Sequence, residues 1–295
     1  FEKGNGTASD YDLLPEYMDT VVKGIDLKRP MRIVVDSGNA AGALCAPEVY
    51  ERMGCEVTAL YCDVDGTFPN HHPDPSKLHN LEDIIREVIN TNADMGFAFD
   101  GDGDRLGLID NKGNVIWADR QMILYSRDIL ERNPGAKIVF DVKCSSLLPK
   151  DISEHGGEPI MSRTGHSFIK AKLKETGAAL GGEMSGHIFF KERWYGFDDA
   201  LYTGARLLEI ISKTDQTCAE VFADLPDSIN TPEINIHFDE QGDQFKAMDK
   251  LATNVDFEGA EITTIDGVRV DYPNGWGLVR PSNTTPCLVL RFEAD

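Results

Sequence analysis

Three aspartates alternate with two glycines directly after an apolar segment, and these residues have the types and spacing for metal chemistry. Residues 94–99 are apolar enough to form a short buried strand, and Asp100, Asp102 and Asp104 follow it. Side chains two residues apart converge only where the backbone curls tightly, which the intervening glycines permit. We therefore expect the three carboxylates to face one point.

Carboxylates held this close repel one another unless a cation neutralises them. Their hard oxygen atoms suit Mg²⁺, which binds a few carboxylates and keeps positions open for water or phosphate. Arg105 follows immediately, and a guanidinium beside a metal can clamp phosphate oxygens. The loop therefore predicts a Mg²⁺ site next to a bound phosphate.

Two simpler interpretations of the same loop are a solvated turn and an EF-hand. A turn without a cation would leave the carboxylate repulsion uncompensated, so we favour the metal site. The first three EF-hand ligand positions fit, but Arg105 stands where that loop needs glycine and Asn111 where it needs glutamate. A strand also precedes the loop where an EF-hand has a helix.

Further polar loops have the residue types for an anionic, hydroxyl-rich ligand. The segment Arg280–Thr285 combines a guanidinium with Ser282, Asn283 and Thr284, which suits a phosphate, although an ordinary polar turn explains it equally well. Glu183, Ser185 and His187 offer an acceptor, a hydroxyl and a titratable ring on one short turn.

Lys143 and His166 each follow a predicted strand. Ligands of α/β folds bind outside the carboxyl ends of strands. Each of these residues taken alone is more typical of a surface charge, and His187 alone is more typical of a structural histidine. The combination of four such loops favours a ligand site.

Asp63-Val64-Asp65-Gly66-Thr67 offers a competing chemistry, because it is similar to the D-x-D-G-T motif of phosphatases with an aspartate nucleophile. The chain shows no later aspartate pair with a lysine in the order such enzymes need. Thr7-Ala8-Ser9 could be offered as a nucleophile, but it lies in a polar and poorly periodic N-terminal stretch.

The elements that must position these loops follow an α/β pattern. Strand-like and helix-like segments alternate from about residue 31 to 99 and again from about 114 to 212, which predicts two successive α/β units. After residue 226 several strand-like segments and one helix near residues 244–254 predict a small α+β domain with an antiparallel sheet. We place the boundaries at 12–113, 114–226 and 227–295, with residues 1–11 as a linker.

Composition excludes several classes of function. The 295 residues carry a formal net charge of −21, which argues against nucleic acid or an anionic membrane as partner. No apolar stretch is long enough to span a bilayer, and Phe1-Glu2-Lys3-Gly4 does not begin a signal peptide. The six cysteines show no C-x-x-C spacing and predict free thiols in a reducing cytoplasm.

Taken together, the loops resemble those of the α-D-phosphohexomutase family. Asp100–Arg105 looks like its metal loop, Gly182–His187 like its sugar-recognition loop and Arg280–Thr285 like its phosphate loop. Residues 70–75 (Asn-His-His-Pro-Asp-Pro) and 191–199 strengthen the match. The resemblance covers nearly the whole chain, in the order of the family's second, third and fourth domains.

The resemblance implies an enzyme that interconverts hexose 1-phosphate and hexose 6-phosphate, with mannose or glucose as the sugar. It implies a phosphoserine enzyme, Mg²⁺ and a hexose 1,6-bisphosphate intermediate. By the same resemblance Asp100, Asp102 and Asp104 would hold the metal. The remaining roles would be phosphoryl and proton transfer by Arg105, Lys143, His166 and His187, sugar binding by Glu183 and Ser185, and binding of the second phosphate by Arg280, Ser282, Asn283 and Thr284.

One part of the family pattern has no match. Its catalytic serine lies in a T-A-S-H-N-P-type loop of an N-terminal domain, whereas Ser9 is followed by Asp10-Tyr11-Asp12. We therefore expect a chain without the first domain and the final helix, with a hinge near residues 226–230 and no mutase activity of its own. The alternatives are a metal-dependent phosphatase of the D-x-D-G-T type and a non-catalytic sugar-phosphate-binding fragment. The sequence does not indicate the oligomeric state.

Overall fold

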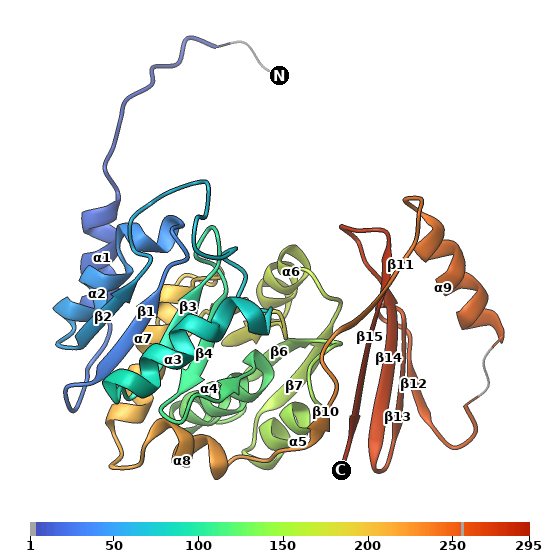
Figure 1. Ribbon diagram of the computed structural model, residues 1–295. Coiled ribbons are helices and arrows are strands. Elements are labelled where there is room, and N and C mark those ends of the chain that lie inside the picture. Colours follow the sequence, from blue (N-terminus) through green and yellow to red (C-terminus); the bar gives the residue numbers. More distant parts are fainter. Residues whose placement is uncertain (1–3, 255–256) are drawn as a thin grey trace.

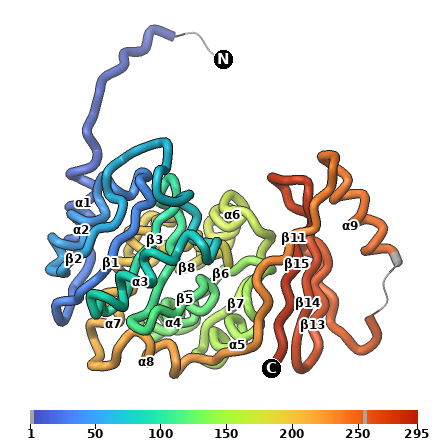
Figure 2. Tube along the Cα trace, in the orientation of Figure 1, coloured from blue at the N-terminus to red at the C-terminus, as the bar shows by residue number. Residues whose placement is uncertain are grey.

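Three β-sheets follow one another along the chain in a computed structural model that describes residues 4–254 and 257–295. The first two sheets and their helices form one continuous body, and the third sheet stands at one end with its helix on the outside (Figure 1, Figure 2). Residues 4–13 extend from the opposite end without regular structure. Two α/β units and an antiparallel domain are thereby confirmed.

The first sheet has the strand order β2-β1-β3-β4-β5. Strand β1 pairs in parallel with β2 and β3, whereas β3-β4 and β4-β5 are antiparallel. The turn between β3 and β4 is the aspartate loop, so the antiparallel return fixes both of its ends. The strands are β1 (Arg32–Asp36), β2 (Glu56–Leu60), β3 (Met95–Phe99), β4 (Leu106–Asp110) and β5 (Val115–Ile116).

Helices cover both faces of this sheet because its strands are apolar on both sides. In β1, Ile33 and Val35 enter one core cluster, while Val34 lies in another with Ile84 and Val88 of α3. The helical segments are α1 (Leu14–Lys23), the short 3₁₀ turns η1 (Ala41–Leu44) and η2 (Leu78–Leu81), α2 (Ala46–Arg52) and α3 (Glu82–Thr91).

The second sheet repeats this plan with the order β7-β6-β8-β9. Strand β6 is parallel to β7 and β8, and β9 returns antiparallel to β8. The turn from β8 to β9 carries the predicted sugar loop, as the turn from β3 to β4 carries the metal loop. The elements are α4 (Ala118–Arg132), β6 (Lys137–Asp141), α5 (Leu147–Glu154), β7 (Glu158–Ser162), α6 (His166–Thr176), β8 (Leu180–Gly182), β9 (Ile188–Phe190), α7 (Ala200–Ser212) and α8 (Cys218–Ala223).

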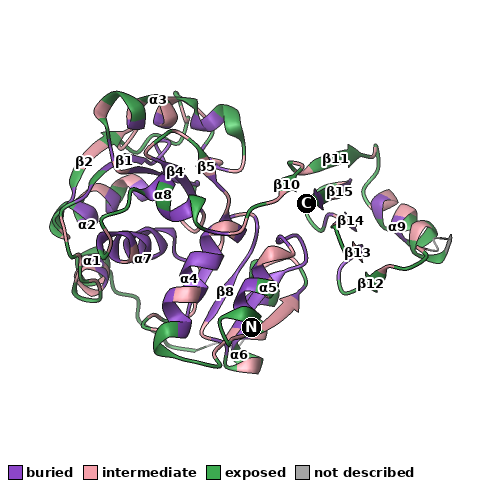
Figure 3. Cartoon of the chain, turned by 90° about the horizontal axis from the view of Figure 1, so that it is seen from below, coloured by how far each residue is buried: buried purple, intermediate pink, exposed green. Residues whose placement is uncertain are grey.

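Helix α7 joins the two units, because its side chains enter the same large core cluster as strands of both sheets. Figure 3 shows that α4 and α7 are the most deeply buried helices between the units. The fully buried guanidinium of Arg206 on α7 forms ion pairs with Asp128 at 3.1 Å and Glu192 at 2.8 Å.

Strand β5 completes the first sheet, although it lies beyond residue 113. The boundary at 113/114 stays a prediction.

The third sheet is antiparallel and packs against the second unit through two arginines. Both Arg269 and Arg291 lie near the Trp276 ring, with guanidinium carbons 3.8 and 5.7 Å from its centroid. Arg269 donates to the carbonyls of Val142 and Cys144, at 2.8 Å each. The elements are β10 (Ile229–Asn230), β11 (Ile234–His237), α9 (Asp243–Asn254), β12 (Glu261–Thr263), β13 (Val268–Tyr272), β14 (Gly275–Pro281) and β15 (Cys287–Ala294).

Two predictions from composition can be compared with the described residues. All six cysteines are free thiols, and five of them are buried. Among the described helices, none combines the length and apolar character that crossing a membrane requires.

Gly204 tests the packing of α7 between the units. Alanine normally stabilises a helix relative to glycine by about 1 kcal/mol. Here a Cβ would overlap the hydroxyl of buried Tyr50, which donates to the Leu201 carbonyl at 3.0 Å. We expect Gly204→Ala to lower the free energy of unfolding by about 1–3 kcal/mol in urea denaturation.

The control for this substitution is the Tyr50→Phe background, in which the overlapping oxygen is gone. Gly204→Ala should cost less there, as a double-mutant cycle would show. An equal cost in both backgrounds would contradict this account of the packing.

Candidate active site

The aspartate loop is shaped by the buried carboxylate of Asp100. Its Oδ1 accepts the backbone N–H groups of Gly103, Asp104 and Arg105 at 3.0–3.1 Å. Gly103 has φ +79°, a left-handed conformation that favours glycine. This curl brings carboxylate oxygens of Asp100, Asp102 and Asp104 within 4.8 Å of one another. The predicted convergence is therefore present.

The loop fits a divalent cation. Burial is the main reason why the pKa of Asp104 is raised to about 7, and the negative charges of Asp100 and Asp102 add to it against the opposing effect of His187. Asp104 Oδ1 is buried and makes no hydrogen bond. A hard cation would neutralise this crowding, and Mg²⁺ accepts such a small set of carboxylates.

Arg105 lies beside the loop with its guanidinium bound to two carboxylates. Its Nε donates to Asp100 Oδ2 at 2.6 Å, and a terminal nitrogen lies 3.4 Å from Asp74 Oδ1. Sequence reasoning did not single out Asp74, although it lies in the 70–75 segment on which the resemblance partly rests. These contacts fix the guanidinium while several of its five donors stay available for a ligand.

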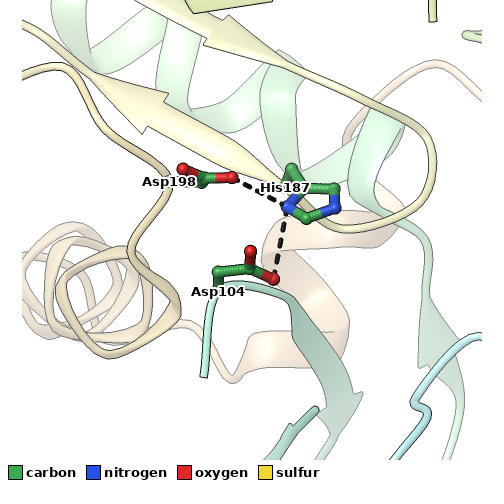
Figure 4. Close-up of side chains that lie close together, drawn as sticks. All are labelled: Asp104, His187 and Asp198. Carbon is green, nitrogen blue, oxygen red and sulfur yellow. Dashed lines mark ion pairs between the residues drawn. The ribbon is translucent and has the colours of Figure 1, made fainter. Parts of the chain in front are cut away.

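His187 connects the loops of the two sheets. Its Nδ1 lies 3.3 Å from Asp104 Oδ1 and 3.1 Å from Asp198 Oδ2 (Figure 4). The backbones meet as well, because Arg105 and His187 form an antiparallel bridge. Burial disfavours the charged ring, yet the carboxylates of Asp198 and Asp104 raise the pKa of His187. The ring is thus placed where it could hold a proton beside the metal loop.

Asp198 is the second residue that sequence reasoning missed. Burial opposes its charge, but hydrogen bonds from His187 and Lys170 hold the pKa of Asp198 at about 2. Lys170 donates to its Oδ1 at 3.1 Å. The predicted His166 is exposed, and its ring stacks on His187 with centroids 5.9 Å apart.

The predicted sugar loop presents Glu183 and Ser185 as a bonded pair. The Ser185 hydroxyl donates to Glu183 Oε2 at 3.1 Å, and the backbone N–H of Gly165 donates to Oε1. Burial and the nearby Asp141 raise the pKa of Glu183. The pair therefore combines an acceptor with a hydroxyl, as recognition of sugar hydroxyls requires.

Lys143 is buried, and its Nζ bonds Glu233 Oε1 at 2.6 Å. Burial disfavours the ammonium, but Glu233 and Asp141 raise the pKa of Lys143. Glu233 lies between strands β10 and β11 of the third sheet, so this ion pair crosses between units. A ligand that needs Lys143 would have to share it with Glu233.

The predicted phosphate loop is tied to the second unit through Asp266. Arg280 Nε donates to Asp266 Oδ2 at 2.9 Å, and the backbone N–H of Thr164 donates to the same oxygen at 3.0 Å. Ser282 is buried and accepts backbone N–H groups within its own turn, whereas Asn283 and Thr284 are exposed. The loop stands near the segment that carries His166, but no side-chain contact joins it to the described metal loop.

A cavity of about 820 Å³ adjoins these loops. Of the predicted residues, Arg105 and Ser185 line it, together with Glu233. Its walls come from the first sheet's loops, the sugar loop and residues 230–233. It is large enough for a sugar phosphate, although the metal aspartates and His187 lie beside it and do not line it.

The competing motifs gain no support from their surroundings. Asp63 is exposed, and Asp65 accepts the backbone and hydroxyl groups of Thr67 in a local turn. Ser9 lies in the exposed N-terminal segment. Neither is placed beside the aspartate loop by any contact of the described residues.

Family models match nearly the whole chain. Those of phosphoglucomutase/phosphomannomutase cover three consecutive parts: alpha/beta/alpha domain II residues 15–113, alpha/beta/alpha domain III residues 117–229 and the C-terminal domain residues 233–295.

Similar proteins are longer than this chain. A phosphoglucomutase of Neisseria meningitidis serogroup A is 58% identical over 98% of this chain and 63% of its own length. A phosphomannomutase/phosphoglucomutase of Pseudomonas putida is 55% identical over 98% of this chain and 62% of its own. A crystal structure of a phosphoglucomutase/phosphomannomutase family protein from Burkholderia thailandensis has a TM-score of 0.94 at 51% identity, covering 100% of this chain and 63% of that one. The chain spans under two thirds of each relative.

Asp102 offers the cleanest test of the metal loop, because it is exposed and no side-chain hydrogen bond of the described residues uses it. We expect Asp102→Asn to weaken Mn²⁺ binding at least tenfold in calorimetric titration, with an unchanged unfolding midpoint. Asp65→Asn is the matched control on a separate exposed acidic turn and should bind Mn²⁺ as the unaltered protein does. Equal affinity of Asp102→Asn and the control would exclude the aspartate loop as the cation site.

Proposed function

The chain belongs to the phosphoglucomutase/phosphomannomutase family, and on that premise we propose that it carries the metal, sugar and phosphate contacts of a hexose phosphate mutase. The proposed reaction interconverts hexose 1-phosphate and hexose 6-phosphate. The observation that carries the proposal is the approach of His187 Nδ1 to Asp104 at 3.3 Å, because it unites the metal loop and the sugar loop in one site. The six free thiols favour a cytoplasmic enzyme.

The proposed chemistry is phosphoryl transfer in two balanced steps. A phosphoserine gives its phosphoryl group to the free hydroxyl of the sugar phosphate, which yields free serine and a hexose 1,6-bisphosphate. The bisphosphate then reverses its orientation in the site. Its other phosphoryl group is transferred to serine, and the isomeric monophosphate remains. We propose that this serine lies outside the present 295 residues.

Asp100, Asp102 and Asp104 would hold Mg²⁺, which when bound neutralises charge on the transferring phosphoryl group. Arg105 is held by Asp100 and Asp74, and its remaining N–H groups would bind oxygen atoms of the transferring phosphoryl group. Such contacts would meet charge that develops during transfer, so they would support the rate more than the initial binding.

The remaining residues would bind and orient the sugar. Glu183 and Ser185 would contact the O3 and O4 hydroxyls. Neither would contact the hydroxyl at C2, where mannose and glucose differ, so both sugars would be accepted. His187 would move a proton at the attacking or leaving hydroxyl, with His166 and Lys143 adding positive charge. The segment Arg280–Thr285 would hold the phosphate that is not transferred.

The test is a coupled mutase assay with mannose 1-phosphate, Mg²⁺ and a trace of glucose 1,6-bisphosphate. It compares two proteins. One is the chain alone, and the other is the chain fused to those segments of the Neisseria meningitidis relative that lie outside the matched region. Turnover by the fusion alone supports the proposal, while no turnover by either would overturn the mutase assignment. Turnover by the chain alone would contradict an external serine, and Ser9 and Asp63 would then be substituted.

Ser185→Ala probes the proposed sugar contact. Loss of the hydroxyl should weaken binding of glucose 1-phosphate about tenfold, which corresponds to about 1.4 kcal/mol for one hydrogen bond. Ser153 on α5 is the control, since its exposed hydroxyl donates to the Pro149 carbonyl within its own helix. If Ser185→Ala and Ser153→Ala bind the sugar phosphate equally well in calorimetry, Ser185 does not contact it.

A further inference from the structure

A buried ion pair at the carboxyl end of β1 belongs to none of the predicted ligand loops. His71 Nε2 lies 3.2 and 3.0 Å from the two carboxylate oxygens of Asp36, whose side chain is fully buried. The His71 side chain is 14% exposed, and its ring meets the Tyr61 ring edge to face with centroids 5.4 Å apart. The pair therefore joins the end of β1 to the 70–75 segment, which follows β2.

The partners of the His71 ring assign its protonation. Nδ1 lies 3.0 Å from the backbone carbonyl oxygen of His72, and a carbonyl oxygen only accepts, so Nδ1 carries a proton. The Asp36 carboxylate already accepts the backbone N–H of Gly38 at 2.9 Å, and an ionised carboxylate needs a donor at Nε2 as well. The ring is therefore an imidazolium. The hydrogen bond to Asp36 raises the pKa of His71 above its ordinary value of 6.5, against the opposing effect of burial.

A second carboxylate acts on the ring from α3. Asp83 accepts the Tyr61 hydroxyl at 2.6 Å and pairs with Arg86, and its negative charge also raises the pKa of His71. The ring thus lies between two carboxylates, and Asp36 forms the direct bond to it. Loss of the imidazolium would leave the buried Asp36 without its cation, which is costly for a buried charge.

His71 is connected to Arg105 through residues of its own segment. The carbonyl oxygen of His72, which accepts the ring N–H, also accepts the backbone N–H of Asp74 at 2.8 Å. Asp74 Oδ1 in turn lies 3.4 Å from a terminal nitrogen of Arg105. Two hydrogen bonds that share one carbonyl oxygen therefore link the His71 ring to the residue that holds the guanidinium.

Two prolines of the 70–75 segment pack against glycines of the aspartate loop and of the strand that follows it. A Cβ at Gly101 would lie 3.8 Å from Pro73 Cγ, which is an ordinary packing contact. A Cβ at Gly107 of β4 would lie only 2.7 Å from Pro75 Cβ, so the two backbones approach closely there. A shift of this segment would therefore be transmitted to the loop.

We propose that protonated His71 is a positioning residue for Arg105. Its pair with Asp36 fixes the 70–75 segment, and Asp74 of that segment sets the direction of the guanidinium. The inference rests on the proposed function, in which Arg105 binds phosphoryl oxygens. Without the imidazolium the segment is released, and the guanidinium loses one of its two carboxylate supports.

Coupling between substitutions tests whether His71 acts through Arg105. The measurement is calorimetric binding of glucose 1-phosphate to the chain at pH 6.5. We expect His71→Gln and Asp74→Asn each to weaken binding about fivefold, and Arg105→Met about tenfold. In the Arg105→Met background the first two substitutions should cost nothing more, because their effect passes through the guanidinium that is already gone.

His72→Gln is the matched control, because the neighbouring exposed ring faces Phe68 and the substitution keeps the backbone carbonyl. It should bind glucose 1-phosphate as the unaltered protein does. Circular dichroism checks that every variant is folded. Asp74→Asn leaves the buried ion pair intact, so it keeps the test decisive even if His71→Gln does not fold.

The pH dependence separates the charge of the His71 ring from its size. The ratio of the dissociation constants of His71→Gln and the unaltered protein cancels the titration of the ligand's own phosphate. Because the pKa of His71 lies above 6.5, the imidazolium is present at that pH and is lost as the pH rises through the raised pKa. We expect the ratio to be about five at pH 6.5 and to fall towards one above this pKa, with ¹⁵N NMR reporting the ring protonation.

Three results would overturn the proposal: a ratio that stays constant with pH, a neutral His71 ring at pH 6.5, or equal costs in both backgrounds. If Arg105→Met weakens binding and neither His71→Gln nor Asp74→Asn does, the proposed role of Arg105 stands and this inference alone fails. If Arg105→Met leaves binding unchanged, that role and this inference fail together. If the coupling is found but the fusion protein has no mutase activity, the positioning stands and the proposed function fails.

Discussion

Crowding of buried carboxylates at the junction of the first two sheets is the constraint on which the candidate site depends. The buried carboxylate of Asp100 accepts three backbone N–H groups and pairs with the Arg105 guanidinium. Asp104 has no such compensation, and burial beside its neighbours raises its pKa to about 7. Positive charge must come from His187 or from a bound cation. The site is therefore arranged to accept cations and the anions that accompany them.

The fold brings these groups together because both α/β units have the same antiparallel return strand. Each α/β unit ends its parallel strands with an antiparallel return, and each return carries one polar loop. Helix α7 packs between the units, and the Arg105–His187 bridge joins the two loops directly. The third sheet is held against the second unit by Arg269 and by the Lys143–Glu233 pair.

Local patterns predicted much of this arrangement. The alternating aspartates and glycines indicated the curl that Gly103 makes, and the repeating α/β pattern indicated two units before the antiparallel sheet. Strand β4 was not predicted, although all five of its residues are buried. Helix α8 was also missed. Its six residues are too few to show a helical period.

The missing site residues depend on long-range contacts. Asp74 meets Arg105 across 31 positions, and Glu233 meets Lys143 across 90. Asp198 follows β9 in a polar stretch that has no metal-binding spacing of its own, and it gains its place only when β9 brings His187 beside it. Such pairings arise from sheet topology, and neighbouring residues do not indicate them.

The central claim is that the metal loop, the sugar loop and the phosphate loop bind one sugar phosphate together. A crystal structure of this chain with Mn²⁺ and glucose 1-phosphate, using the anomalous signal of the metal, tests it most directly. We expect Mn²⁺ on Asp100, Asp102 and Asp104, sugar hydroxyls on Glu183 and Ser185, and the phosphate on the Arg280–Thr285 segment. A sugar phosphate bound away from these loops, or Mn²⁺ bound elsewhere, would contradict it.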